Sequence, residues 1–148
     1  VSMVLQAFGG DAQRAIAYLA KSLDIASEAD LARLGVRVRC AGMWLDIHAP
    51  DEFRFAVRSV PVTRELQEAH RTVLARLVSG LESLPENFTE AEIIPTLKTM
   101  LEGTSLAPTD FFPTAYDLLL DRSQGPKLST LLATLGAARS LSLLRASL

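Results

Sequence analysis

The chain has 148 residues, of which 49% are apolar and 22% charged, and its formal net charge is −2. This is enough chain to bury a substantial core, and the charge argues against a uniformly basic nucleic-acid binder, so any RNA contact must be local. No apolar run is long enough to span a bilayer, no signal peptide is evident, and the single cysteine, Cys40, excludes an internal disulfide. We therefore expect a cytoplasmic globular protein.

Residues 1–49 show the spacing of helices. Gly9-Gly10 separates a short apolar segment from a helix that begins at Asp11, and Ser27 with Asp30 matches the cap of the next helix. That second helix is apolar on more than one face and should be central. Pro50 ends it. The apolar stripe of the helix after Asp11 contains Ala12, Ile16, Leu19 and Leu23. The second apolar face of the helix after Ser27 contains Val36, Cys40, Met43, Trp44 and Ile47.

Residues 50–62 are predicted to be a connector. Two prolines bracket them, and the alternation of Phe53, Phe55 and Val57 indicates an extended chain whose aromatic rings pin it to the helices. The sequence therefore predicts an N-terminal helical subdomain over 1–49 and a second over 63–148.

The second subdomain is predicted to be helical throughout. Thr63 is expected to cap a helix that Pro85 stops, and Thr89 with Glu92 forms a capping box for the next. Further along, Thr109 is expected to cap a helix, Pro126 to be the first residue of the next, and Gly136 to end it. A final helix then runs to Leu148. We find no convincing sheet and no internal repeat, so the predicted fold class is all-α.

The sequence offers little catalytic chemistry. His48 and His70 have no Cys or acidic partner at metal-ligand spacing, and Gly9-Gly10 lacks the context of a phosphate-binding loop. Glu90 with Glu92 fits helix-end or solvated acids better than a poised carboxylate pair. We predict no catalytic residue, no metal site and no cofactor for this chain.

The C-terminal end is the basic end of the sequence. After Asp121 there is no Asp or Glu, while Arg122, Lys127, Arg139 and Arg145 remain. These cations could be ordinary solvated charges on a terminal helical pair or a local RNA-binding patch.

A helix beginning Thr63-Arg64-Glu65-Leu66, a second opening at Phe88-Thr89-Glu90 and the stretch 111–144 together resemble the C-terminal half of class I lysyl-tRNA synthetases. With the N-terminal helices included, the resemblance covers almost the whole chain. The family pattern is a Phe-Phe-x-x-x-Tyr helix, a short basic turn, Gly-Pro-basic-Leu, and a leucine helix that closes in Leu-Gly. The corresponding residues here are Phe111, Phe112, Tyr116, Gly125, Pro126, Lys127, Leu128, Leu135 and Gly136, with Trp44 and the Ala49–Phe55 link upstream. Glutamyl-tRNA synthetases share the Gly-Pro-basic-Leu part. Three positions depart from the family pattern. Asp121 stands where the family usually has Gly, Lys127 where it often has Arg, and Ala137-Ala138 where a basic-acidic pair is common.

The resemblance implies an anticodon-binding α-helix cage. In this family an N-terminal Rossmann domain activates lysine with ATP through two signature motifs, and neither motif occurs in this sequence. The implied role is that of a non-catalytic part that binds the anticodon stem-loop of lysine tRNA and works with the catalytic domain of its parent synthetase. We expect neither a membrane nor DNA as a partner.

The candidate RNA-binding residues are Arg122, Gln124, Lys127 and Arg139. Cations suit phosphates, and planar or amide side chains suit unstacked bases. The N-termini of the helices near Lys127 and Ala137 could also present free N–H groups to a phosphate. The aromatic residues Trp44, Phe111, Phe112 and Tyr116 could stack on bases, although aromatics at helical spacing usually belong to the core.

Two other functions stay open. One is a glutamyl-type anticodon-binding domain. The other is a helical protein-interaction scaffold, which an exposed apolar patch without a basic one would favour.

Overall fold

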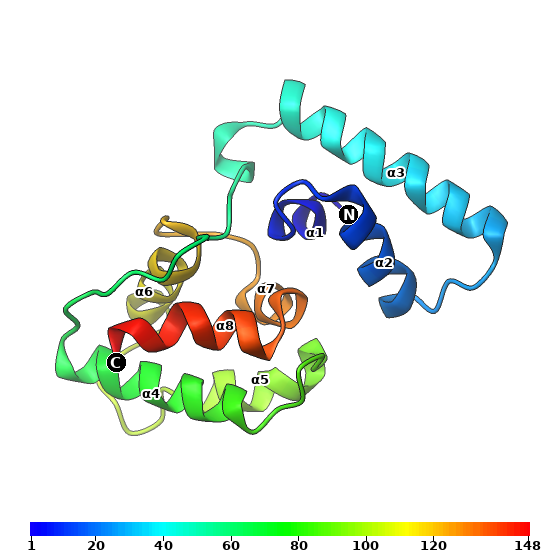
Figure 1. Ribbon diagram of the computed structural model, residues 1–148. Coiled ribbons are helices and arrows are strands. Elements are labelled where there is room, and N and C mark those ends of the chain that lie inside the picture. The colour runs from blue at the N-terminus through cyan, green and yellow to red at the C-terminus, as the bar shows by residue number, and fades with distance from the viewer. The chain divides into compact units, whose positions relative to one another are not determined.

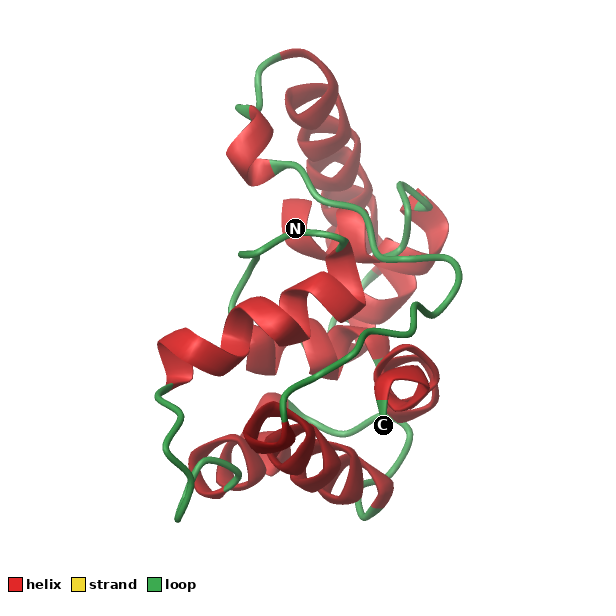
Figure 2. Ribbon diagram, turned by 90° about the vertical axis from the view of Figure 1, so that its left-hand side faces the viewer, coloured by secondary structure: helices red, strands yellow, loops and turns green.

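The computed structural model describes residues 1–148 and consists of helices and loops (Figure 1). Figure 2 shows no strand anywhere in the chain, so the predicted all-α class is confirmed. The chain divides into two compact units, Val1–Val57 and Arg58–Leu148. We call them unit 1 and unit 2. None of the helices combines the length and apolarity that crossing a membrane requires.

Unit 1 is a group of three helices. Both predicted caps are confirmed: the Asp11 carboxylate accepts the Arg14 N–H at 3.0 Å, and Ser27 Oγ accepts the Asp30 N–H at 3.1 Å. The first two helices pack on the third, which is the longest. The elements are α1 (Ser2–Ala7), α2 (Ala12–Ser22), α3 (Glu28–Ile47) and the short 3-10 helix η1 (Asp51–Phe53).

Helix α3 is covered on one face only. Leu34, Val38 and Leu45 are buried against the short helices α1 and α2. The sequence predicts that this helix is central, because it has more than one apolar face. Both short helices do pack on it, but six residues of α1 and eleven of α2 cover only one side of a helix of twenty. The exposed face carries Val36 (49% exposed), Met43 (62%), Trp44 (40%) and Ile47 (64%).

A glutamine side chain fastens the extended chain that follows η1. The Gln6 amide donates to the Phe53 carbonyl at 3.1 Å and accepts the Phe55 N–H at 2.7 Å. Phe53 itself is 58% exposed and touches Trp44 edge-on, with ring centroids 6.1 Å apart. The backbone is therefore held mainly through hydrogen bonds to Gln6, whereas the sequence had suggested the aromatic rings.

Unit 2 is a bundle of five helices. Helix α4 packs against α5, α6 and α8, while α7 packs against α5 and α8. The elements are α4 (Glu68–Glu82), α5 (Glu90–Thr99), α6 (Pro108–Leu120), α7 (Leu128–Leu135), α8 (Ala137–Leu144) and the 3-10 helix η2 (Arg145–Ser147). The fully buried side chains include Leu74, Leu77, Leu81, Ile93, Phe111, Leu118, Leu131, Leu132, Leu143 and Leu144.

Some helix ends in unit 2 lie where the sequence predicted them. The capping box of α5 is confirmed, with the Thr89 N–H donating to the Glu92 carboxylate at 2.7 Å. Gly136 ends α7 with a positive φ of 80°. Both features depend on residues close together in sequence, so local chemistry alone specifies them.

Three predicted helix starts are wrong. Helix α4 begins at Glu68 and not at Thr63, since the preceding residues are held extended by contacts described below. Thr109 lies inside α6, where the Asp110 carboxylate accepts the Ala107 N–H at 2.8 Å. Pro126 stays outside α7 because its carbonyl accepts a hydrogen bond from Tyr116, at 2.6 Å.

Candidate nucleic-acid interface

The 121–127 loop, which joins α6 to α7, is anchored along its length. It opens with Asp121 in a left-handed conformation, φ 58°. Gly125 lies flat on Tyr116 and Leu120, where a Cβ would come within 2.6 Å of the Leu120 side chain. Burial of the Tyr116 ring raises the pKa of its hydroxyl, which donates to Pro126 near the far end of the loop. The loop is therefore held in one conformation.

Three of the four predicted RNA-binding residues belong to this loop. Gln124 and Lys127 are exposed, and Arg122 is half-buried and not free of contacts. Arg139 lies on α8, where its guanidinium donates to the Arg58 carbonyl at 2.5 Å. RNA contact by these residues stays a prediction.

Glu90 is the first residue of α5, and its carboxylate contacts three side chains at the start of α7. Lys127 Nζ forms an ion pair with it, Ser129 Oγ donates to it at 2.9 Å, and Thr130 Oγ1 donates at 3.0 Å. Lys127 first, then the two hydroxyls, hold the pKa of Glu90 below its usual range, so it is ionised at neutral pH. Lys127 is exposed but already paired.

Glu86 caps the N-terminus of α8. Its carbonyl accepts the Ala137 N–H at 3.1 Å, and its carboxylate accepts the Ala138 N–H at 2.9 Å. The expectation of free N–H groups at this helix start is therefore wrong for these two residues. A side chain from a different part of the chain supplies the anion that a helix N-terminus favours.

The acid-free C-terminal end is not a free basic end in three dimensions. Glu82 forms an ion pair with Arg145, Glu86 caps α8, and Glu90 pairs with Lys127. The acids that oppose these groups all come from residues 82–90. Glu86 and Glu90 could not be recognised from the sequence as parts of this region, because nothing in the local sequence relates them to partners tens of residues away.

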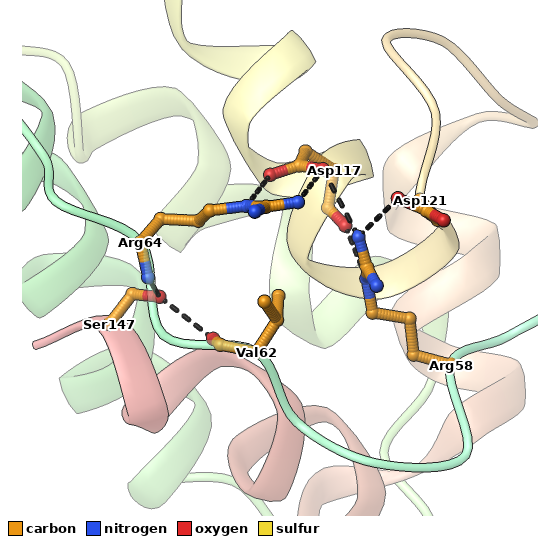
Figure 3. Close-up of polar contacts among 6 residues, drawn as sticks. All are labelled: Arg58, Val62, Arg64, Asp117, Asp121 and Ser147. Carbon is orange, nitrogen blue, oxygen red and sulfur yellow. Dashed lines mark hydrogen bonds and ion pairs between the residues drawn. The ribbon is translucent and has the colours of Figure 1, made fainter.

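A second polar cluster fixes residues 58–67, which we call the strap, across unit 2. Arg58 Nε donates to the Asp117 carbonyl at 2.8 Å, and its guanidinium also pairs with the carboxylates of Asp117 and Asp121 (Figure 3). The Arg58 N–H donates to the Leu119 carbonyl at 2.8 Å. Arg58 thereby ties the strap to the end of α6 and to the first residue of the 121–127 loop.

The strap is held a second time at Arg64. Its guanidinium donates to both carboxylate oxygens of Asp117, at 2.8 and 3.2 Å, and its N–H donates to Ser147 Oγ at 2.9 Å. Ser147 Oγ in turn donates to the Val62 carbonyl at 3.0 Å (Figure 3). The Arg64 guanidinium is the main reason that the pKa of Asp117 lies below its ordinary value. These contacts keep residues 62–64 extended and prevent a helix from starting at Thr63.

Replacing Arg58 with alanine should destabilise unit 2 by about 2 kcal/mol, because hydrogen bonds to charged groups contribute roughly 1.5–3 kcal/mol and its side chain is only 17% exposed. Arg71→Ala is the matched control, since Arg71 is exposed on α4 and has no polar side-chain contact. Chemical denaturation at pH 7 measures the free energy of unfolding of both variants.

The stabilisation by this cluster should also depend on pH. Asp117 has a depressed pKa in the folded protein, so its contribution to stability is present above the unfolded pKa and is lost as pH falls through the folded pKa. Arg58 supplies a smaller part of this depression than Arg64, so the difference between wild type and Arg58→Ala should narrow only in part below about pH 4. Equal losses for Arg58→Ala and Arg71→Ala would contradict the role of the cluster.

The aromatic residues of the family pattern serve mainly the core. Phe111 is fully buried, Tyr116 is 8% exposed, and Phe112 is half-buried. Trp44 is the most exposed of the four candidates and lies in unit 1. Base stacking by Phe111 is excluded by its burial.

Comparison with known proteins shows a similarity to lysine–tRNA ligases. No protein-family model matches the chain. It is similar to lysine–tRNA ligases of archaea and spirochaetes.

Three of these relatives define the extent of the similarity. The ligase of Methanopyrus kandleri is 33% identical over 112 residues, which make up 76% of this chain and 20% of that protein. The Pyrococcus furiosus ligase is 29% identical over 74% of the chain and 21% of its own length. The Treponema pallidum ligase is 28% identical over 94% of the chain and 26% of its own length. The chain thus spans a fifth to a quarter of the ligases that it matches.

Proposed function

We propose that this chain is the tRNA-binding part of a class I lysyl-tRNA synthetase and that it holds the anticodon stem-loop of lysine tRNA. The observation that carries the proposal is its similarity to lysine–tRNA ligases over up to 94% of its length. The matched segment makes up only 20% to 26% of those ligases, so lysine activation with ATP would belong to a catalytic domain outside it. That domain and the tRNA would be the partners of this chain in the cytoplasm, and the chain itself would need no cofactor.

The polar side chains and the rigidity of the 121–127 loop support this proposal. Lys127 and Arg122 would contact phosphates, and the exposed Gln124 amide would reach the edge of an unstacked base. A loop that is already fixed by Asp121, Gly125 and Pro126 loses little conformational freedom on binding. Arg139 on α8 would add a further cation, although part of its donor capacity is used by Arg58.

Anticodon discrimination tests the proposal. A lysine stem-loop should bind at least about fivefold more tightly than one with altered second and third anticodon bases, because a lost base hydrogen bond costs roughly 1 kcal/mol. Those two bases define lysine codons. Fluorescence anisotropy with labelled stem-loops at low salt measures both affinities. Equal affinities would leave only charge attraction and would favour the second candidate below.

The second candidate is a protein-interaction scaffold, and the exposed face of α3 favours it. Val36, Met43 and Ile47 recur at helical spacing and are each about half exposed or more. A strip of this kind marks a protein contact more often than a random surface does. Arg37 and Arg39 flank it and are also exposed, so a partner with acidic residues beside an apolar helix would fit. The glutamyl alternative is less favoured, because the relatives above are lysine ligases.

A further inference from the structure

The contacts of Glu90 have the composition of an anion-binding site. One carboxylate receives an ammonium group from Lys127 and two hydroxyl hydrogen bonds, from Ser129 and Thr130. These three groups lie at the N-terminal end of α7, where the helix dipole also favours negative charge. An ammonium and two hydroxyls beside a helix start are equally suited to the oxygens of a phosphate.

Glu90 is fixed in this position by its own helix. It is the first residue of α5, directly after the Thr89 cap, and the Thr89–Glu92 capping box holds that turn. The preceding Phe88 is 3% exposed and anchors the loop in the core. The carboxylate is therefore presented to α7 by a built element and not by a mobile surface side chain.

We propose that Glu90 acts as an internal substitute for a nucleic-acid phosphate, occupying Lys127, Ser129 and Thr130 until an RNA phosphate displaces it. This inference rests on the proposed function and adds a specificity-determining residue to it. Glu86 has a parallel position, since its carboxylate occupies the Ala138 N–H at the start of α8. Glu86 lies in the short connection between α4 and α5, and Glu90 directly follows that connection.

Displacing the Glu90 carboxylate costs free energy. An RNA that makes no compensating contacts therefore binds with lower affinity. A phosphate that takes Lys127 removes the main partner of Glu90 and leaves a carboxylate beside a second anion, which is repulsive. Only an RNA that gains further contacts, such as base contacts at Gln124, offsets that cost. The cost of displacing Glu90 would thus weaken the binding of RNAs that are attracted by charge alone.

A double-mutant cycle tests this role of Glu90. Wild type, Glu90→Gln, Lys127→Ala and the double variant are titrated with the lysine anticodon stem-loop by fluorescence anisotropy at fixed low salt. We expect Glu90→Gln to raise affinity about tenfold when Lys127 is present and less than about twofold when it is alanine, because the competition acts through Lys127. Glu65→Gln is the control: Glu65 is exposed, has no side-chain partner and carries the same charge. It should change affinity less than about twofold.

A second measurement does not depend on RNA. Inorganic phosphate is titrated into isotope-labelled protein, and the amide signals of Ser129 and Thr130 are followed by NMR. Saturable shifts are expected in Glu90→Gln and not in wild type. No shift in a folded Glu90→Gln protein, or an equal affinity gain with and without Lys127, would overturn the inference. Phosphate binding by Glu90→Gln together with no RNA binding by any variant would instead refute the proposed function and leave the displaced anion site standing.

Discussion

Replacing Gly136 with alanine is expected to destabilise unit 2 by about 3 kcal/mol or more. Gly136 has φ 80° and ψ 170°, a region that is essentially restricted to glycine and costs other residues about 1–3 kcal/mol. A Cβ there would also come within 2.7 Å of the Glu86 carboxylate and 3.0 Å of its carbonyl oxygen. Both oxygen groups accept hydrogen bonds from the first turn of α8, so relieving the clash would break that cap.

Gly103→Ala is the matched control for this experiment. Gly103 also has a positive φ, 71°, but a Cβ there would meet nothing within 4 Å. It should cost only the backbone strain, about 1 kcal/mol. Urea denaturation of the two variants separates strain from close approach. Equal losses would show that the contact between Gly136 and Glu86 contributes little to stability.

Reversing charge at both Lys127 and Arg122 should weaken binding of the lysine stem-loop on the order of tenfold or more. Each contact with a single-stranded phosphate contributes roughly −0.7 to the slope of log affinity against log salt. Three contacts predict a slope of about −2, and loss of two leaves about −0.7. Anisotropy titrations over a range of salt concentrations measure both quantities. An unchanged slope in Lys127→Glu/Arg122→Glu would place the RNA contacts elsewhere.

The control for charge reversal must avoid the structural arginines. Arg64 pairs with Asp117, and Arg76 donates to the carbonyls of Met100 and Glu102, so changes there would disturb the fold. Arg71 is exposed on α4 without such contacts, and Arg71→Glu should leave the salt slope nearly unchanged. A comparable loss of affinity in Arg71→Glu would indicate a diffuse effect of net charge.

The departure of Asp121 from the family pattern has a structural explanation. Its left-handed φ of 58° is a conformation that glycine adopts without strain. Asp tolerates it better than most residues, and its carboxylate here pairs with Arg58. The sequence showed only that Asp replaced the usual Gly. The ion pair that accompanies the replacement became visible only when residues 63 positions apart were seen together.

The sequence by itself determined the helical class, most helix ends and the relationship to lysine–tRNA ligases. The caps at Asp11, Ser27 and Thr89 and the stop at Gly136 depend on hydrogen bonds and dihedral angles within a few residues, so their residue types are sufficient to predict them.

The tertiary structure decided which charges are available. Glu90 and Lys127 are 37 residues apart, and Arg58 and Asp117 are 59 apart, so no local pattern could pair them. Long-range contacts also keep residues 63–67 out of α4, although the sequence predicted a helix from Thr63. The ion pairs and hydrogen bonds of Arg58 and Arg64 outweigh the few tenths of a kcal/mol per residue of helix propensity. Packing of α5 on α7 likewise brings an acid to a basic segment that contains none of its own.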